Sequence, residues 1–477
     1  MVSKITPASE DYSQWYTDIV QAAEMADYSP VRGCMVIRPY GYALWENVQQ
    51  GLDRRFKATG HQNAYFPLFI PESFIRKEAQ HVEGFSPELA VVTHGGGKEL
   101  EEPLIVRPTS ETIINAMYVK WVRSYRDLPL LINQWCNVVR WEMRTRLFLR
   151  TTEFLWQEGH TAHATAAEAR EETMRMLEIY RDFAESDAAI PVIPGRKSDT
   201  EKFAGAVESY AIEAMMGNKW ALQAGTSHFL GQNFAKAFGT QYLDENNELQ
   251  YVWQTSWGVS TRMVGAIVMV HGDDQGLRLP PRLAPTQVVV VPIWKSDEER
   301  TAVMAVAQDL KRTLGATFRC HVDDREDVSP GFKFNDWEMR GVPLRIELGP
   351  RDVAKDQAVL VRRDLPRKQN KSMAELGALS AVVGEQLEAI QGNLFAQASC
   401  FLHDNTREPQ TYEELREAVA DGFALAFWCG SADCEARVKE DTRATIRCIP
   451  LNQQQAAGRC VCCGEPASEK AVFARAY

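Results

Sequence analysis

The sequence predicts an α+β protein of several domains, in which a large and mostly antiparallel sheet is followed by a compact α/β unit. Three observations lead to this prediction. Strand-like runs mix with a long helical segment before residue 284, strands and helices alternate after it, and cysteines crowd into the last part of the chain. A length of 477 residues suggests two to four domains, at about 100 to 200 residues each. We expect domains of residues 1–283, 284–394 and 395–477.

Composition limits the classes of function. The net charge is 53 − 64 = −11, which argues against indiscriminate binding of nucleic acid and requires local basic patches for any polyanion. No apolar run approaches the roughly 20 residues needed to cross a bilayer, and the start MVSKITPASEDYSQW lacks the pattern of a secretory signal. We therefore expect a cytoplasmic protein without a membrane span.

The expected elements follow from hydrophobic periodicity. In the first domain we expect strands at 65–70, 130–135 and 265–272, and a long helix over 165–186. The proline-punctuated stretch 277–294 marks the boundary to the second domain. There the expected order is strand 287–293, helix 298–314, strand 317–323, helix 331–342, and strands 343–349 and 358–364.

The stretch VVRWEMRTRLFLRTTEF, residues 138–154, holds four arginines in an acidic protein. On a strand, alternation puts Arg140 and Glu142 on one face. A basic loop and a returning strand, 147–156, then bring Arg150 and Phe154 near them. A surface hairpin with an Arg–Glu cross-strand pair is the alternative. The arginine excess and the nearby aromatics favour a site where guanidinium grips carboxylate or phosphate and a ring stacks on a base.

These residues resemble motif 2 of the class II aminoacyl-tRNA synthetases, here about 136–158. Residues 44–71, a helix followed by GHQNAYFPLFIP with Pro67, resemble motif 1, which forms the dimer interface in that family. Residues 255–276, TSWGVSTRMVGAIVMVHGDDQG, resemble motif 3, whose arginine is here Arg262. The resemblance implies an antiparallel-sheet catalytic domain over 1–283, a homodimer, ATP with Mg²⁺, and Arg140, Glu142 and Arg262 as catalytic residues.

The stretch RPTSETII, residues 107–114, resembles the TxE loop of the class II subgroup that serves proline, threonine, serine and glycine, with Thr109 and Glu111 as ligands of the substrate ammonium. A capping box explains the same residues and is compatible with that role. Four further runs, GCMVIRPYGYALWENVQ, FLWQEGHTAHAT, KFAGAVESYAIEAMM and QAGTSHFLGQNFAKAF, are similar to the prolyl-tRNA synthetase family of the archaeal and eukaryotic type, over essentially the whole chain.

That similarity implies a ligase that activates L-proline with ATP and transfers the prolyl group to tRNA(Pro). The implied proline-binding residues are Thr109, Glu111, Arg140, Trp156, Glu158, His160, Phe203, His228 and Ser260. The implied ATP-binding residues are Arg140, Glu142, Arg150, Thr151, Phe154, Gln223, Thr226 and Arg262. Rival readings are a synthetase for threonine, serine or glycine, and a silent paralogue that binds RNA.

Six of the ten cysteines lie between residues 429 and 463. Cys429-x4-Cys434 and Cys460-x2-Cys463 have the spacing of two knuckles of a structural zinc site. Cys462 in place of Cys463 is an open alternative, and we expect Cys448 to pack among apolar neighbours. The resemblance likewise implies a zinc-binding domain over 395–477.

In residues 284–394 the resemblance is to the class II anticodon-binding fold. The candidates for reading the anticodon are Lys333, Glu338, Arg340, Arg345 and Glu347, and the basic run 361–371 is either a solvated turn or part of that surface. The resemblance also hints that Tyr477 reaches toward the active site. It further implies that this chain lacks the editing insertion that bacterial-type prolyl enzymes carry between motifs 2 and 3.

Two other features have residue types that are common in binding sites. HGGGKEL, residues 94–100, lacks the spacing of a P-loop and is interpreted as a flexible surface or substrate-covering loop. His160 and His163 could share a metal, but a substrate-facing or satisfied histidine is the favoured interpretation.

Overall fold

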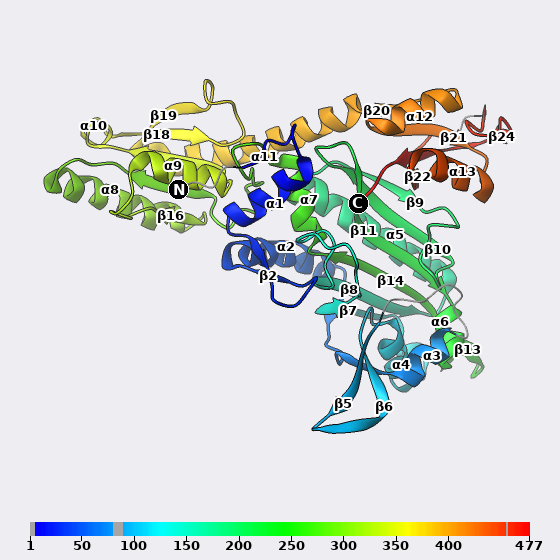
Figure 1. Ribbon diagram of the computed structural model, residues 1–477. Coiled ribbons are helices and arrows are strands. Elements are labelled where there is room, and N and C mark those ends of the chain that lie inside the picture. Colours follow the sequence, from blue (N-terminus) through cyan, green and yellow to red (C-terminus); the bar gives the residue numbers. More distant parts are fainter. Residues whose placement is uncertain (1–4, 80–88, 455–456) are drawn as a thin grey trace.

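The structure is a computed structural model, and it describes residues 5–79, 89–454 and 457–477. Figure 1 shows a central sheet with helices packed on it, an α/β part at one end, and a smaller C-terminal part above the sheet. This architecture confirms the predicted fold class. Within these ranges, no helix is both long enough and apolar enough to cross a membrane.

The central sheet has 11 strands among the described residues, in the order β20-β21-β25-β22-β9-β10-β11-β14-β8-β7-β3. Its neighbouring strands in the first domain are antiparallel except for β3 and β7. These strands are β3 (Gln62–Asn63), β7 (Leu130–Val139), β8 (Glu153–His163), β9 (Val192–Arg196), β10 (Glu208–Met215), β11 (Ala221–Gly231) and β14 (Trp253–Ser260).

Helices α2 (Pro39–Ala58) and α5 (Ala166–Asp182) cover one face of this sheet. Helix α5 begins with a capping box, in which Thr165 and Glu168 satisfy each other's backbone N–H groups. The core between helices and sheet contains Phe56, whose ring centroid lies 5.0 Å from that of Trp257. Gly159 of β8 faces this tryptophan, and a Cβ there would lie 2.0 Å from the indole ring. The sheet and the aromatic core therefore require glycine at this position.

The motif 2 segment differs from the predicted strand pair. Strand β7 ends at Val139 and β8 begins at Glu153, so Arg140, Glu142 and Arg150 lie on the connecting segment. The segment keeps some bonds of a hairpin, such as the one from the Arg140 N–H to the Thr152 carbonyl oxygen, but the Thr152 N–H donates to the Gly33 carbonyl oxygen at 2.8 Å. The left-handed backbone of Phe148, with φ of 61°, also breaks a strand.

The strand predicted at 265–272 is wrong: these residues belong to helix α7 (Arg262–His271). Almost every residue of α7 is buried, including Gly265. A continuous apolar run does not distinguish a buried strand from a buried helix, and here the helix is formed. The strand predicted at 65–70 is only partly formed, because β4 spans Phe69–Pro71.

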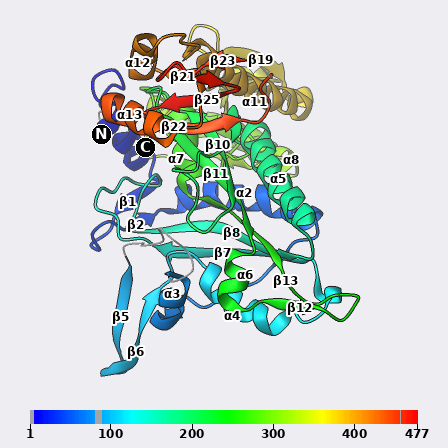
Figure 2. The same cartoon turned by 90° about the vertical axis from the view of Figure 1, so that its right-hand side faces the viewer.

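Strand β4 pairs with a long hairpin, β5 (Ala90–Gly95) and β6 (Lys98–Val106), beside α3 (Glu72–Ala79) and α4 (Glu111–Trp121). In Figures 1 and 2 this hairpin projects from the body, at the end opposite to the C-terminal part. The stretch HGGGKEL forms the hairpin tip, where Gly96 and Gly97 have positive φ. This exposed tip agrees with the surface-loop alternative, and the substrate-covering alternative stays a prediction.

The smaller elements of the first domain are α1 (Tyr12–Ala22), β1 (Ala26–Tyr28), β2 (Met35–Ile37), α6 (Asn233–Phe238), β12 (Gln241–Leu243) and β13 (Leu249–Tyr251).

The second domain has a five-stranded sheet of order β16-β15-β17-β18-β19. Its elements are β15 (Val288–Pro292), α8 (Asp297–Gly315), β16 (Cys320–Val322), α9 (Pro330–Met339), β17 (Leu344–Leu348), α10 (Pro350–Ala354), β18 (Gln357–Arg362) and β19 (Lys371–Glu375). Strand β15 is parallel to β16 and β17, and all its residues are buried, as its β-branched run predicts.

Helix α11 (Leu379–Asp404) leads from this domain to the C-terminal part (Figure 1). Its first half packs into the core of the second domain through residues such as Val383 and Leu387. The expected boundary at residue 395 therefore falls inside one continuous helix, and the domain division stays a prediction.

The C-terminal part extends the central sheet. Its elements are β20 (Thr406–Arg407), α12 (Tyr412–Ala420), β21 (Phe423–Trp428), α13 (Ala432–Thr442), β22 (Thr445–Pro450), β23 (Gly458–Arg459), β24 (Pro466–Ala467) and β25 (Glu469–Ala474). Strand β22 pairs with β9, with Ile449 opposite Arg196 and Pro450 opposite Gly195. One sheet therefore connects the first and last parts of the chain.

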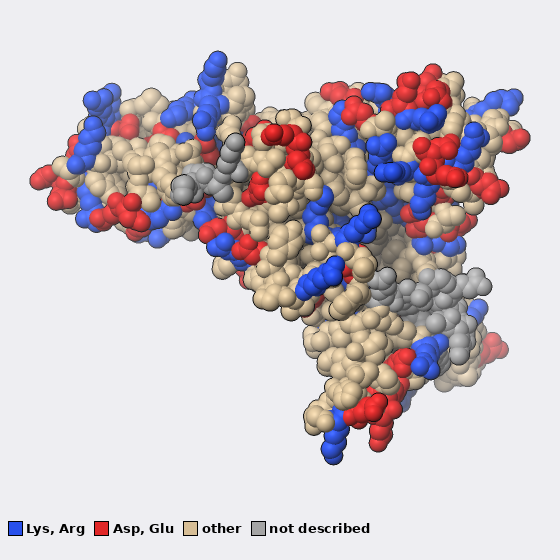
Figure 3. Space-filling model, in the orientation of Figure 1, with Lys and Arg blue, Asp and Glu red and all other residues tan. Residues whose placement is uncertain are grey.

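Figure 3 shows acidic and basic side chains interspersed over one face of the molecule.

Candidate active site

Strands β8, β11 and β14 form much of the wall of a cavity of about 460 Å³. Most of the residues that the sequence singled out line this one cavity. They are Thr109, Glu111, Arg140, Phe154, Trp156, Glu158, His160, Phe203, Gln223, Thr226, His228, Ser260 and Arg262. Residues more than 150 positions apart in the sequence thus meet in one place.

Glu158 is the centre of a buried hydrogen-bond network. Its carboxylate accepts from the Gln134 amide at 2.9 Å and from the Ser110 hydroxyl, and it lies 3.0 Å from Nε2 of His160. Burial raises the pKa of Glu158, but the bonds from His160, Ser110 and Gln134 outweigh it and lower the pKa to about 2. Burial likewise lowers the pKa of His160, while Glu158 raises it further than burial lowers it. Each partner of the pair therefore favours the charged form of the other.

Thr109 and Glu111 lie at the start of helix α4. The Thr109 hydroxyl donates to Oε2 of Glu111, and both side chains are buried. The expected side-chain cap is absent at this helix, since Ser110 stands at the N-cap position without a side-chain capping bond. Among the described residues, the Ser110 hydroxyl instead donates a hydrogen bond to the Glu158 carboxylate. The capping-box explanation therefore does not account for this segment.

Arg140 combines a polar and an aromatic contact. Its Nε donates to the Pro108 carbonyl oxygen at 2.9 Å, and its guanidinium carbon lies 5.5 Å and 5.2 Å from the ring centroids of Phe154 and Trp156. Burial lowers the pKa of Arg140, and the charges of Glu111 and Glu158 oppose that shift. A guanidinium stays protonated in such surroundings. The cavity thus joins a fixed cation to a buried carboxylate, Glu111, which suits a small zwitterion.

A second guanidinium, that of Arg262, enters the cavity from the start of α7. Its Nε donates to the Leu149 carbonyl oxygen at 3.0 Å. Burial and the positive charges of Arg150 and Arg140 lower its pKa to about 10. The repulsion between these cations indicates a place for a polyanion.

His228 and Phe203 form the aromatic part of the wall. Their ring centroids are 4.8 Å apart, and Nδ1 of His228 lies 2.9 Å from the Ser209 hydroxyl. Burial and the charges of Lys197 and His160 lower the pKa of His228 to about 3, so its imidazole is neutral at physiological pH. This region offers a flat, mostly apolar surface to a ligand.

Three predicted ATP residues do not line the cavity. Glu142 and Arg150 form an ion pair at 3.7 Å on the connecting segment, and the Thr151 hydroxyl donates to the backbone of Glu153. His163 is held at 2.7 Å from the Thr161 hydroxyl, so it does not pair with His160. In the described part of the chain, neither histidine belongs to a cluster of potential metal ligands.

Sequence reasoning missed Lys197, Glu201, Ser209 and Ser256, which also line the cavity. Lys197 is nearly fully buried, and its ammonium donates to Oε1 of Glu213 and to the Arg447 carbonyl oxygen, each at 2.7 Å. No local motif marks this lysine, because one of its partners comes from the C-terminal part.

Tyr477 does not line the cavity but lies beside motif 2. The guanidinium carbon of Arg146 is 5.4 Å from its ring centroid, and its hydroxyl accepts from Asn218 at 2.6 Å. The C-terminus thus packs on the motif 2 segment without entering the cavity.

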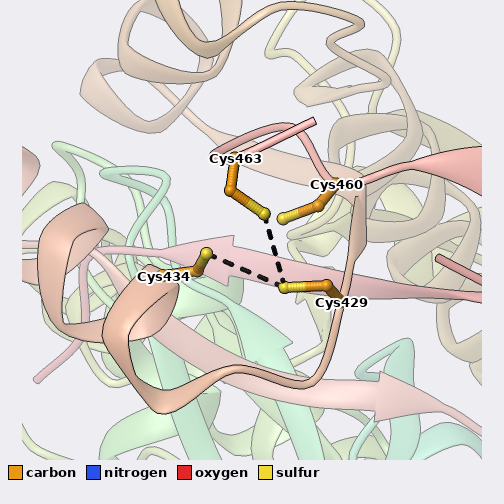
Figure 4. Close-up of side chains that lie close together, drawn as sticks. All are labelled: Cys429, Cys434, Cys460 and Cys463. Atoms are coloured by element: carbon orange, nitrogen blue, oxygen red, sulfur yellow. Dashed lines mark hydrogen bonds between the residues drawn. The ribbon is translucent and has the colours of Figure 1, made fainter. Parts of the chain in front are cut away.

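Figure 4 shows Cys429, Cys434, Cys460 and Cys463 pointing toward one another. Their four sulfur atoms lie within 4.8 Å of one another, and Cys429 is 3.7 Å from both Cys434 and Cys463. Tetrahedral zinc with bonds of about 2.3 Å would set sulfur atoms about 3.8 Å apart. The cluster contains Cys463 and not Cys462, whereas Cys448 is buried among apolar residues as expected.

Two cysteines of the cluster are followed by glycines in tight turns. Gly430 and Gly464 follow Cys429 and Cys463 with φ of 86° and 80°, the left-handed conformation that glycine tolerates. The Gly464 N–H donates to the Cys460 carbonyl oxygen. Burial raises the pKa of Cys460, but backbone N–H groups of Cys463 and Cys462 outweigh it and lower the pKa to about 7. This turn therefore favours the thiolate that a metal requires.

The five anticodon candidates separate into two groups. Arg345 donates to Glu347 at 3.0 Å and to Glu338 at 3.5 Å, and the basic residues Arg367 and Lys371 pair with these same carboxylates. The other two candidates are held elsewhere: Lys333 donates to the Asp323 carbonyl oxygen, and Arg340 pairs with Glu24 of the first domain. Only the first group forms a single polar patch.

Comparison with known families gives three matches along the chain. Residues 92–271 match the class II core domain of tRNA synthetases for glycine, histidine, proline, serine and threonine. Residues 287–380 match an anticodon-binding domain, and residues 412–477 match the C-terminal domain of prolyl-tRNA synthetases.

Curated relatives are similar over the full chain. A proline–tRNA ligase of Roseiflexus castenholzii is 59% identical over 475 residues, which cover 99% of both chains. The corresponding enzyme of Chlorobium phaeobacteroides is 59% identical over 485 residues and 100% of both chains. A chloroplastic/mitochondrial proline–tRNA ligase of Arabidopsis thaliana is 59% identical over 478 residues, which cover 99% of this chain and 88% of the relative.

Proposed function

Because this chain belongs to the prolyl-tRNA synthetase family, it is a proline–tRNA ligase, and we propose that the residues of the cavity divide its two-step reaction among them. In the first step, an oxygen of the proline carboxylate attacks the α-phosphorus of ATP. The bond from that phosphorus to the bridging oxygen breaks, and pyrophosphate leaves. In the second step, a ribose hydroxyl of the tRNA 3′ end attacks the carbonyl carbon of prolyl-adenylate and AMP leaves.

The first step needs positioning and charge stabilisation more than proton transfer. A carboxylate is already ionised at neutral pH, so it needs no general base. Mg²⁺ bound with ATP neutralises part of the phosphate charge. We assign alignment of the carboxylate and the α-phosphate to Arg140, adenine stacking to Phe154, and the outer phosphates to Arg262. The buried and mutually repelling guanidiniums of Arg140 and Arg262 support this assignment.

The substrate end of the cavity suits proline. Glu111 would pair with the secondary ammonium, and Trp156, Phe203 and the neutral ring of His228 would enclose the pyrrolidine. The Glu158–His160 pair lines the same cavity and fixes the start of α4 through Ser110. Of the predicted ATP residues, Glu142 and Arg150 face each other outside the cavity, so we propose that they act once ATP is bound.

One observation supports the proposal most directly: four predicted residues meet in a single cavity of a chain 59% identical to a proline–tRNA ligase, namely Glu111, Arg140, Glu158 and Arg262. The test is ATP–pyrophosphate exchange with each amino acid. We expect saturable exchange with proline. Exchange with threonine, serine or glycine but not proline would overturn the assignment of the amino acid. No exchange with any amino acid would overturn the assignment of a synthetase activity.

We also propose that the four-cysteine cluster binds Zn²⁺ as a structural metal. Four thiolates fill a tetrahedral shell and leave no position for a catalytic water. We expect about one zinc per chain by elemental analysis, loss of that zinc in Cys463→Ser, and retention in the matched Cys462→Ser. Loss in Cys462→Ser alone would assign the site to the other cysteine.

A homodimer through motif 1 is part of the proposal. Tyr65, Pro67 and Phe69 are exposed beside β4, and an apolar row of this kind is usual at a subunit interface. We expect a dimer by light scattering and a monomer for the double variant Tyr65→Glu, Phe69→Glu. A monomeric wild type at micromolar concentration would contradict it.

The patch of Glu338, Arg345 and Glu347 is our candidate for the anticodon. Mixed guanidinium and carboxylate groups suit hydrogen bonding to unpaired bases. We expect Arg345→Ala to raise the KM for tRNA(Pro) and to leave proline-dependent exchange unchanged. Arg340→Ala, which removes a contact to Glu24, serves as the comparison.

We place the enzyme in the cytoplasm, where charged tRNA meets the ribosome. The Arabidopsis relative carries an organellar name, so an organelle is the alternative. Localisation of the tagged protein in its own cells decides between them.

A further inference from the structure

One wall of the cavity comes from a loop and not from a strand. Residues 197–207 connect β9 to β10, and Lys197, Glu201 and Phe203 of this loop line the cavity. The first domain holds the loop by backbone bonds at its two ends and by apolar packing around Phe203 and Ala206. The Phe203 N–H donates to the Ser209 hydroxyl at 3.0 Å, and Asn233 donates to the Gly205 carbonyl oxygen at 2.9 Å.

The C-terminal part holds the same loop at three places: the Arg447 carbonyl oxygen accepts from Lys197, Lys439 lies 4.0 Å from Glu201, and Glu435 binds two hydroxyls. Glu435 of α13 accepts from the Ser198 hydroxyl at 2.9 Å and from the Thr200 hydroxyl at 2.6 Å, one bond to each of its oxygens. Glu435 is 5% exposed. A buried carboxylate without partners is costly, so these two hydroxyls and Glu435 hold one another in place.

Glu435 is also fixed in position by the cysteine cluster. It directly follows Cys434, one of the four cysteines, in the first turn of α13. The N-cap Ser431 fixes the start of this helix by accepting from the Asp433 N–H. A metal bound at the cluster would therefore hold the helix turn that carries Glu435, and through it the loop.

We propose that Glu435 is a positioning residue for proline binding, whose carboxylate holds residues 198–203 against the amino-acid cavity. The domain that carries the cysteine cluster thereby sets the wall of a pocket to which its cysteines contribute no atom. This inference rests on the proposed use of the cavity for proline.

The first test is steady-state ATP–pyrophosphate exchange with Glu435→Ala. Loss of two hydrogen bonds should raise the KM for proline about tenfold. The KM for ATP should stay within about twofold, because the loop lies at the amino-acid end. Glu435→Gln should restore most of the affinity, since its amide can accept from one hydroxyl and donate to the other. Glu440→Ala, an exposed residue on the same helix, is the matched control.

The second test approaches the contact from the loop. Ser198→Ala with Thr200→Val should raise the KM for proline as Glu435→Ala does, and combining all three changes should add little, because they remove one interaction. Hydrogen exchange of peptides covering residues 198–206 should rise in both variants and not in Glu440→Ala. Zinc content should stay at the wild-type value.

The outcomes separate this inference from the proposed function. Absence of proline-dependent exchange in the wild-type protein would contradict the proposed function itself. Normal wild-type exchange with an unchanged KM for proline in Glu435→Ala, or a parallel rise of both KM values, would overturn the positioning role. If Glu435→Ala loses its zinc or fails to fold, the loop-side variant decides the question alone.

Discussion

Arg140 is the residue on which the chemistry depends most directly. Its guanidinium lies beside two aromatic rings and is fixed by the Pro108 carbonyl oxygen. We expect Arg140→Ala to lower kcat/KM in the exchange reaction by about 100- to 1,000-fold, the usual loss for a fixed group that stabilises developing charge. Arg144→Ala, exposed on the same segment, should stay near wild type. Similar losses in both variants would count against the assignment.

The low pKa of Glu158 predicts how the free energy of unfolding depends on pH. Its pKa is lowered from 4.5 to about 2, so the ionised carboxylate stabilises the fold above pH 4.5, by roughly 3 kcal/mol. This stabilisation is lost as the pH falls from about 5 toward 2. Between pH 6 and pH 4, the free energy of urea unfolding should fall by about 1 kcal/mol more in wild type than in Glu158→Gln.

The comparison needs a second variant, because other carboxylates titrate in the same range. Glu440→Gln, which removes an exposed carboxylate, should follow the wild-type slope. Equal slopes for wild type and Glu158→Gln would mean that Glu158 has an ordinary pKa.

Individual residues were predictable where a motif carries them. Arg140, Glu111 and Arg262 stand in recognisable spacings, and all three line the cavity. Lys197 could not be found in this way, because its burial depends on Glu213 and on a carbonyl oxygen of Arg447, about 250 positions away. Spacing alone predicts Cys463 over Cys462, and in the structure the sulfur of Cys463 lies 3.7 Å from that of Cys429.

At the scale of elements, the junction of β9, β10 and β22 contains a buried charge cluster. Glu213 of β10 pairs with Lys197 at 2.7 Å and with Arg447 of β22 at 3.1 Å, and all three residues are buried. Two cations share one carboxylate, so the three charged side chains do not contribute equally to the stability of the fold.

We therefore expect an order of stabilities. Glu213→Gln leaves two buried cations without a carboxylate and should cost about 3–5 kcal/mol of unfolding free energy. Arg447→Met leaves the Lys197–Glu213 pair intact and should cost less. Urea unfolding followed by circular dichroism measures both, and a larger loss in Arg447→Met would contradict the order.

Elements were predicted well where the period was clear, as in α5 and in the alternating strands and helices of the second domain. Helix α7 was missed because its apolar run has no polar face to reveal a helical period. The segment after β7 was missed because its backbone bonds to Gly33, a long-range contact that local patterns do not encode.

At the scale of the whole molecule, the segment between motifs 2 and 3 predicts how well the enzyme discriminates between proline and smaller amino acids. The elements from β8 to β14 belong to the central sheet or pack against it. In an apolar pocket, each missing methylene lowers the kcat/KM of a smaller amino acid by only roughly 10- to 200-fold. We expect alanine to support slow exchange and Ala-tRNA(Pro) to accumulate. Hydrolysis of purified Ala-tRNA(Pro) by the enzyme alone would show an editing activity.

The continuous sheet has a consequence for anyone who shortens this chain. Strand β9 has β22 on one side and β10 on the other, so removal of the C-terminal part leaves a row of unpaired backbone N–H and C=O groups at a new sheet edge. Such bare edges recruit strands from other molecules. A catalytic fragment cut near residue 395 would therefore be prone to aggregate through this exposed edge.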